Sequence, residues 1–160
     1  MKKWSSLFGF VALAQIVGGS SAVATVKARK EGWYDGLKKP SWTPSDGAFG
    51  PVWMVLFTLM GIAAWRVWQR REENPAESKR ALQLWGVQLV LNAAWGWIFF
   101  GMRKPKWALG EIFVLWNAII LTMRALGKRD RVAGALFVPY LLWTSFAALI
   151  TLEIARRNAE

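Results

Sequence analysis

Carboxamide and aromatic side chains share one face of an apolar segment, where they could bind a ligand. Gln88, Asn92, Trp95 and Phe99 follow one another at spacings of four, three and four, which aligns them along a helix. Amides in hydrocarbon are costly unless they are paired, so we expect this face to point inward. Two interpretations remain open: hydrogen bonding between helices, which amides commonly provide in membrane bundles, and lining of a ligand cavity.

Three of the twelve tryptophans lie deep within apolar segments, namely Trp53, Trp95 and Trp143. Most of the others lie near segment ends, where tryptophan usually anchors a helix at the membrane interface. Aromatic stripes usually serve packing, but the depth of these three favours an aromatic interior suited to a large planar ligand.

Conventional catalytic chemistry has little support, because the chain contains no histidine and no cysteine. It lacks the commonest metal ligand, the commonest general base and any thiol nucleophile. We therefore expect no metal site and no cofactor. Glu111 and Glu153 are the best intramembrane carboxylates, but both lie near segment ends, where snorkelling or pairing with Arg103, Lys106 or Arg156 is the favoured role.

The elements that position these residues are apolar segments of membrane-spanning length. The chain has 160 residues, 54% of them hydrophobic, and a mean hydropathy of +0.23. Crossing a hydrocarbon core takes about 20 residues of helix. We predict an all-α fold, an integral membrane bundle of five transmembrane helices forming a single domain over residues 1–160. The predicted helices are residues 4–26, 51–69, 81–100, 107–126 and 132–154.

Two of the apolar segments carry open questions. The first follows a basic start and contains Ala22-Val23-Ala24, which fits a signal-peptide cleavage pattern; its length favours a retained helix. The last contains Pro139, which predicts a kink over residues 135–139 because proline cannot donate to the carbonyl four residues earlier. Such a kink could widen a cavity or be inert. Gly and Pro residues between the first two helices predict a long loop over residues 27–50.

The formal charge of +11 would suggest nucleic acid binding in a soluble protein. Here Lys and Arg fall between the apolar segments, so contact with lipid headgroups explains them better and no nucleic acid partner is expected. The basic residues divide almost evenly between the two sides of the membrane, so their distribution does not decide the orientation.

Several motifs together resemble one family. The segment WYDGLKKPSWTP at residues 33–44 is followed by GPVW at residues 50–53 and MG at residues 60–61. Gln88, Asn92, Trp95 and the sequence FFG at residues 99–101 continue the pattern, as do PYL at residues 139–141 and Trp143. The chain is similar over nearly its whole length to the translocator proteins, also called tryptophan-rich sensory proteins.

The resemblance implies a five-helix bundle, usually dimeric, with a pocket beneath the first loop that binds porphyrins and other hydrophobic ligands. By position, the expected ligand-binding residues are Val23, Val26, Trp42, Phe49, Gly50, Val52, Trp53, Asn92, Trp95, Trp107, Gly110, Val114, Trp143, Ala147 and Ile150. Trp53 and Trp143 also match the tryptophans implicated in light-dependent porphyrin breakdown by some bacterial members.

The chain departs from the family pattern at three places. Pro44 is followed by residues 45–47, SDG, where the family prefers a second proline and a tryptophan, so the loop is expected to close less tightly. Thr151 replaces a usual asparagine. Leu152 replaces the aromatic centre of a proposed cholesterol motif that ends at Arg156, so sterol recognition through that motif is not expected.

We therefore expect a membrane receptor or transporter-like protein that binds porphyrins, with a sensory or regulatory role and a homodimeric assembly. The alternative is a light-dependent porphyrin-degrading enzyme that uses Trp53 and Trp143. A small multidrug exporter is a third possibility on architecture alone. The physiological ligand stays open, as does the host membrane: a bacterial cell membrane is favoured, with a bacterial or mitochondrial outer membrane as alternatives.

Overall fold

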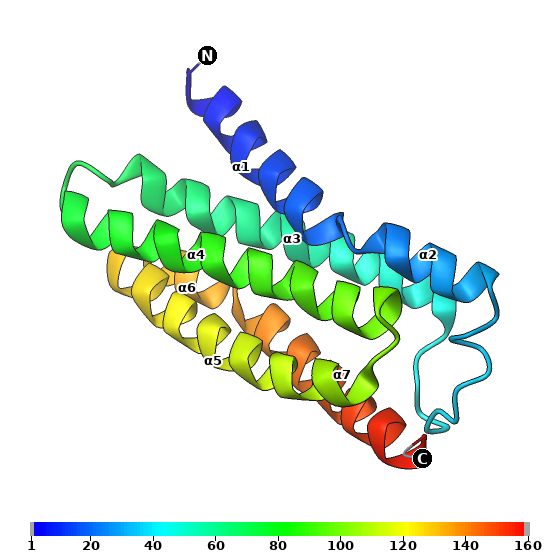
Figure 1. Ribbon diagram of the computed structural model, residues 1–160. Helices are drawn as coiled ribbons and strands as arrows, with labels where there is room; N and C mark the ends of the chain where they lie inside the picture. The colour runs from blue at the N-terminus through cyan, green and yellow to red at the C-terminus, as the bar shows by residue number, and fades with distance from the viewer. Residues whose placement is uncertain (1, 159–160) are drawn as a thin grey trace.

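The computed structural model describes residues 2–158, which form helices joined by turns and loops, with no β-strand in that range (Figure 1). Five helical segments are long and apolar enough to cross a membrane. The predicted all-α fold class with five such segments is confirmed. The helices are α1 (Lys2–Gly19), α2 (Ala22–Lys30), α3 (Asp46–Gln69), α4 (Pro75–Gly96), the π-helical turn η1 (Trp97–Gly101), α5 (Pro105–Arg129), α6 (Arg131–Ala135) and α7 (Val138–Arg157).

The first loop is shorter than the sequence predicts. Helix α2 continues to Lys30 instead of ending before Lys27, because basic side chains in its last turn interact favourably with the negative end of the helix dipole. Helix α3 begins at Asp46 rather than at Pro51, and this acidic residue in the first turn faces the positive end of the dipole. The loop is thus confined to residues 31–45, and the first turn of α3 becomes available to line a site.

Two of the spanning segments are broken in the middle. Helices α1 and α2 meet at Ser20 and Ser21, and α6 and α7 meet at Leu136 and Phe137. The second break lies where the kink is predicted, because Pro139 has no N–H to donate to the carbonyl of residue 135. Breaks of this kind change the direction of a helix and let it diverge from its neighbours.

The helices form a closed arrangement in which each span packs against its neighbours. Helix α1 contacts α3 and α4, and α5 contacts α4, α6 and α7; α3 contacts α6, and η1 contacts α2. Gly61 allows the close crossing of α1 over α3, because a Cβ there would lie 2.6 Å from the Val11 Cα. The N-terminal end of α1 projects beyond the bundle, whereas the loop after α2 lies beside the C-terminus (Figure 1).

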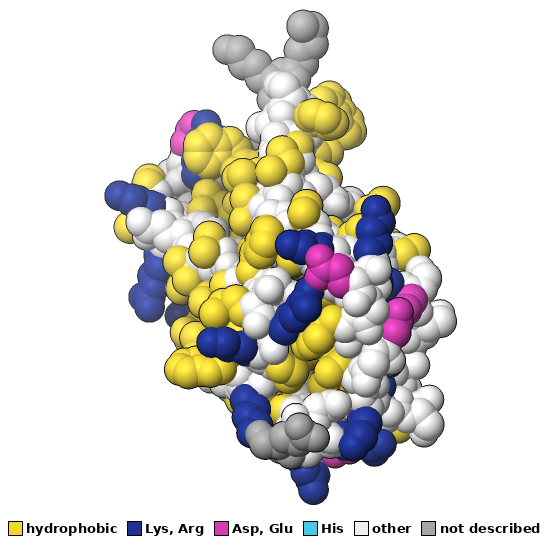
Figure 2. All heavy atoms as spheres, turned by 45° about the vertical axis from the view of Figure 1, so that its right-hand side comes forward, with side chains coloured by type: hydrophobic (Ala, Val, Ile, Leu, Met, Phe, Trp, Pro, Cys, Tyr) yellow, Lys and Arg dark blue, Asp and Glu magenta, His cyan; other side chains and the backbone are white. Residues whose placement is uncertain are grey.

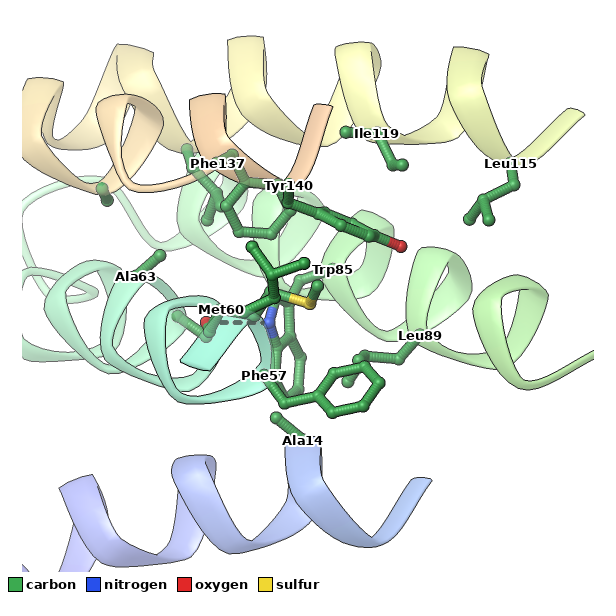
Figure 3. Close-up of a cluster of buried hydrophobic side chains, with 14 of the residues drawn as sticks. Ala14, Phe57, Met60, Ala63, Trp85, Leu89, Leu115, Ile119, Phe137 and Tyr140 are labelled. Atoms are coloured by element: carbon green, nitrogen blue, oxygen red, sulfur yellow. Dashed lines mark hydrogen bonds between the residues drawn. The ribbon is translucent and has the colours of Figure 1, made fainter. Parts of the chain in front are cut away.

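The centre of the bundle is tightly packed by large side chains from α3, α4, α5 and α7 (Figure 3). Met60 and Tyr140 are fully buried. The Trp85 indole Nε1 donates to the Met60 carbonyl oxygen at 3.0 Å, shown as the dashed line in Figure 3. This core separates a loop end, which contains α2, the start of α3 and the end of α7, from an opposite end formed by the α3–α4 and α5–α6 connectors.

Lysine and arginine side chains do not gather into one continuous surface. On the face in Figure 2 they are interspersed with hydrophobic and acidic side chains. Several lie in the last turns of helices, including Lys30, Lys128 and Arg157. This distribution fits contacts with lipid headgroups at the helix ends.

Candidate ligand-binding cavity

A cavity of about 400 Å³ lies at the loop end, enclosed by α1, α2, α3, α4, η1 and α7. Cavities that hold small ligands commonly range from about 300 to 1,000 Å³. The lining residues are mostly apolar or aromatic: Gln15, Gly18, Gly19, Ser21, Ala22, Thr25, Val26, Arg29, Tyr34, Asp46, Gly47, Phe49, Gly50, Trp53, Met54, Phe57, Asn92, Trp95, Gly96, Phe100, Trp143 and Ala147.

Aromatic rings from three helices form much of the wall. The rings of Trp53 and Trp143 are nearly perpendicular, with centroids 6.5 Å apart. Trp53 also stacks on Phe57 at 5.4 Å, and Trp143 meets Phe49 edge-on at 5.8 Å. Because each ring is held by another ring, the wall offers preformed aromatic surfaces to a flat apolar ligand.

The polar face predicted on the helix at residues 81–100, which forms most of α4, has two roles. Asn92 lines the cavity and donates from Nδ2 to the Tyr140 hydroxyl at 3.1 Å. Gln88 lies in the core instead, where its Nε2 faces the Met60 sulfur at 3.9 Å. One amide therefore links helices away from the cavity, while the other both links helices and faces the cavity.

Two indole N–H groups at the cavity are unpaired within the chain. Trp95 and Trp143 each bury their Nε1 atoms with no hydrogen-bond acceptor in reach among the described residues. Buried polar groups are normally hydrogen-bonded, so these two donors are unusual. Because neither atom is accessible, a ligand contacts the indole rings and reaches the N–H groups only if a ring moves.

The mouth of the cavity holds an ion pair between Arg29 of α2 and Asp46 of α3, with Nη2 and Oδ1 3.3 Å apart. The Arg29 guanidinium also lies over the rings of Tyr34 and Phe49, at 5.3 and 6.0 Å from their centroids. Burial raises the pKa of Tyr34, the Asp46 charge adds to the rise, Arg29 opposes it and Asp35 adds a smaller increase. The Tyr34 phenol is therefore neutral at neutral pH.

The loop over the cavity is fastened at several points. Asn158 accepts from the Lys38 backbone N–H at 3.0 Å and donates from Nδ2 to the Lys38 carbonyl at 3.1 Å. The Lys39 ammonium donates to the Tyr34 carbonyl at 2.6 Å, and Arg103 pairs with Glu31. These contacts join the loop to the end of α7 and to the turn before α5, so opening the loop requires them to break.

The structure brings many of the expected ligand-binding residues together at this cavity. Those that line it are Val26, Phe49, Gly50, Trp53, Asn92, Trp95, Trp143 and Ala147. They come from four separate spans, so the convergence is a property of the tertiary fold.

The remaining expected residues lie elsewhere. Trp107, Gly110 and Val114 share the outer face of α5, where Trp107 is 73% exposed and Val114 is 57% exposed. Helix α5 turns its opposite face, including Ile112 and Leu115, toward the core. Because α4 and α7 lie between α5 and the cavity side of the bundle, no residue of α5 lines the cavity in the described chain.

Four further expected residues take other positions around the loop end. Val23 is exposed on α2, and Trp42 packs its ring against Phe146 at 5.6 Å. Ile150 is buried in the small cluster that contains Tyr34. Val52 lines an apolar groove between α3 and α7 on the outside of the bundle, and Trp143 lines both that groove and the cavity.

The sequence analysis did not identify the polar residues at the mouth and along α2. Ala22, Thr25 and Arg29 line the cavity on the same helical face as Val26, which was expected there. Their spacing could have identified them had the helix been expected to continue past Val26. Asp46 was assigned to the loop, so its place in the wall could not be predicted.

The comparisons with known proteins agree with these features. The chain matches the sequence profile of the TspO/MBR family over residues 10–157, which include every residue lining the cavity. It is 38% identical to the tryptophan-rich protein TspO of Chlorobaculum tepidum, over 92% of this chain and 92% of that protein. It is 36% identical to the tryptophan-rich sensory protein of Cereibacter sphaeroides (97% and 92% covered) and 34% identical to the translocator protein of Homo sapiens (97% and 91% covered).

Proposed function

Because this chain belongs to the TspO/MBR family and is an integral, multi-pass membrane protein, we propose that it is a receptor that binds porphyrins, and other hydrophobic ligands, in the cavity beneath the first loop. The observation that carries the proposal is the convergence of Trp53, Trp95 and Trp143 on one cavity. A tetrapyrrole presents a wide flat π-surface, which stacks favourably on such rings.

The proposed role is sensory or regulatory. One relative carries the name tryptophan-rich sensory protein, and others are named translocator protein. The loop contacts described above offer a physical means of signalling, since a ligand that favours one loop position over another shifts the equilibrium between them.

The test is a titration of purified protein in detergent with protoporphyrin in darkness, followed by the change in the Soret band. Saturable binding is expected, and Trp53→Ala or Trp143→Ala should weaken it by roughly tenfold, since a lost aromatic contact costs about 1.4 kcal/mol. Trp107→Ala is the matched control, because that indole is exposed outside the cavity. Absence of saturable binding in folded wild-type protein, or equal weakening by Trp107→Ala, would contradict the proposal.

A second candidate function is light-dependent degradation of the bound porphyrin. The observation that favours it is the perpendicular Trp53–Trp143 pair, whose ring centroids are 6.5 Å apart in the cavity wall. A porphyrin bound there would absorb the light, dissolved dioxygen would be the oxidant, and the two indoles would position the macrocycle. Illumination should then abolish the Soret band and yield a defined product. The double variant Trp53→Phe, Trp143→Phe should lose this reaction, while Trp107→Phe retains it; equal bleaching in all three proteins would exclude the enzyme.

We also propose a homodimer. Support comes from the apolar outer face of α1, where Trp4, Phe8 and Ile16 are each more than two-thirds exposed. Contact with a second copy or with lipid would cover this face. Cross-linking in native membranes after placing a single cysteine at Gly9, which has no neighbour within 4 Å of an added Cβ, should give a covalent dimer. A matched cysteine at Val114 should not.

A further inference from the structure

The charged groups of the cavity are confined to its mouth. Arg29 and Asp46 are the two charged residues among its described lining residues, and they come from opposite sides, from the end of α2 and the start of α3. The other lining residues are neutral. Any charged ligand group that enters the cavity therefore meets one guanidinium and one carboxylate.

The ion pair between Arg29 and Asp46 is weak, because its contacts are long and its carboxylate is half-exposed. Its Nη2–Oδ1 distance is 3.3 Å, and the second contact, from Nη1 to the Asp46 backbone oxygen, is 3.4 Å. The Asp46 side chain is 52% exposed to solvent, where an ion pair contributes little. Asp46 thus does not hold Arg29 strongly enough to prevent a better acceptor from replacing it.

The Nη atoms of Arg29, which now contact Asp46, are the donors that a ligand carboxylate would meet. The Arg29 Nε atom is buried and has no hydrogen-bond acceptor in reach among the described residues. Arginine binds carboxylates best through two parallel N–H groups, and the two Nη atoms form such a fork. The rings of Tyr34 and Phe49 hold the guanidinium in place, so little side-chain freedom is lost when an anion binds.

Other cations near the mouth are directed elsewhere. The Lys39 ammonium lies over the Tyr34 ring, 4.4 Å from its centroid, and donates to a loop carbonyl. Lys27 lies 4.0 Å from Glu31, and Arg103 also pairs with Glu31. None of these three lines the cavity, so Arg29 is the cation positioned to contact a ligand within it.

We propose that Arg29 binds a carboxylate of the ligand, so that the cavity selects hydrophobic carboxylic acids over their neutral esters. The apolar body lies among Trp53, Trp95 and Trp143, while the carboxylate replaces Asp46 on the Arg29 guanidinium at the mouth. Asp46 opposes this binding through like-charge repulsion and by competing for the same donor. The inference rests on the proposed porphyrin-binding function and adds the chemical class that the site prefers.

The experiment compares protoporphyrin IX, which carries two propionic acids, with its dimethyl ester, by titrating each into detergent-solubilised full-length protein. Wild-type protein should bind the diacid about tenfold more tightly than the diester, since a charge-assisted pair is replaced by a neutral one. Arg29→Gln should weaken diacid binding about tenfold and change diester binding by less than twofold. Asp46→Asn should tighten diacid binding and leave diester binding unchanged.

Lys30→Gln is the matched control, because it removes the same charge from the same turn of α2 but does not line the cavity. It should leave the preference for the diacid intact. Diester binding by each variant also reports whether its cavity is folded. If Arg29→Gln weakens both ligands equally, or wild-type protein binds both equally, Arg29 is not a carboxylate anchor, although porphyrin binding stands. If neither ligand binds wild-type protein, the proposed function itself fails.

Discussion

The two ends of the bundle differ in how deeply the carboxylate of their central ion pair is buried. At the end opposite the loop, the Asp130 side chain is only 3% exposed, yet every part of it is paired. Its Oδ2 atom lies 2.9 Å from Arg66 Nη2 and 3.5 Å from Arg70 Nε. Its Oδ1 atom accepts a hydrogen bond from the Ala133 backbone N–H at 3.0 Å, which caps α6. At the loop end, by contrast, the carboxylate of the Arg29–Asp46 pair belongs to a side chain that is 52% exposed. An arginine Nε without an acceptor among the described residues occurs at both ends, in Arg66 and in Arg29.

A second network strengthens the contrast at the end opposite the loop. Arg129 is 11% exposed and pairs with Glu73 and Glu77, each at 3.4 Å, while its Nε donates to the Ser78 hydroxyl at 3.2 Å. These contacts join the connector between α3 and α4 to the last turn of α5. Polar groups that satisfy one another fix the positions of helices.

This difference in burial predicts that one end contributes mainly to the stability of the fold and the other mainly to ligand binding. At the paired end, removing one group leaves another buried without a partner, so substitutions there are expected to destabilise the fold. At the loop end, the Asp46 carboxylate is half-exposed and water can solvate it, so substitutions there are expected to change affinity more than stability. Two predictions compare one substitution at each end, and the third concerns Asp130 alone.

The largest expected effect follows the change Asp130→Ala. It leaves Arg66 and Arg70 without their shared carboxylate and removes the cap of α6, which should lower the free energy of unfolding by about 3 kcal/mol. Asp46→Ala at the loop end should cost less than about 1 kcal/mol, because that pair is exposed. Circular dichroism during denaturation in mixed micelles measures both; equal losses would remove the distinction between the ends.

A smaller effect is expected from adding a single methyl group to a glycine. In Gly134→Ala the new Cβ would lie 2.8 Å from the Gly127 Cα and 3.1 Å from the Met123 carbonyl oxygen, which should destabilise the fold by about 1 to 2 kcal/mol. In Gly47→Ala at the cavity wall the Cβ would meet nothing within 4 Å, so stability should be unchanged or rise by up to about 1 kcal/mol from helix propensity. Thermal unfolding of the two variants tests the difference, and a Gly134→Ala protein as stable as the wild type would contradict it.

The smallest expected effect is a dependence of stability on acid pH. Burial alone would raise the pKa of Asp130, but the hydrogen bond from Arg66, the Ala133 N–H and the charges of Arg66 and Arg70 together hold that pKa below its ordinary value of 3.8. A carboxylate with a lowered pKa in the folded state stabilises the fold above its ordinary pKa. That stabilisation is lost as the pH falls below 3.8 toward the folded-state value.

Asp130→Asn tests this dependence without removing the cap, because an asparagine oxygen can also accept from the Ala133 N–H. The melting temperature of the variant should be lower than that of the wild type at pH 6, and the gap between them should narrow as the pH falls below 4. A constant gap over that range would show that the charge of Asp130 does not contribute.

Much of the cavity wall could be predicted from the sequence, but its boundaries could not. Trp53, Trp95 and Trp143 were identified by their depth in apolar segments, which is a local property. Trp107 and Val114 were expected in the site and lie on the outer face of α5. In a membrane, lipid-facing and cavity-facing positions are both apolar, so hydrophobicity cannot distinguish Val114 from Val26.

The sequence by itself determined the number of spans, the helical class and the family, because segment length, apolar content and motif spacing are read along the chain. Only the tertiary structure decided that Arg29 and Asp46 face each other across a cavity mouth, that α5 is excluded from the wall and that Asp130 is buried among arginines. These outcomes depend on where helices break and which faces meet, and both are set by contacts between residues far apart in the chain.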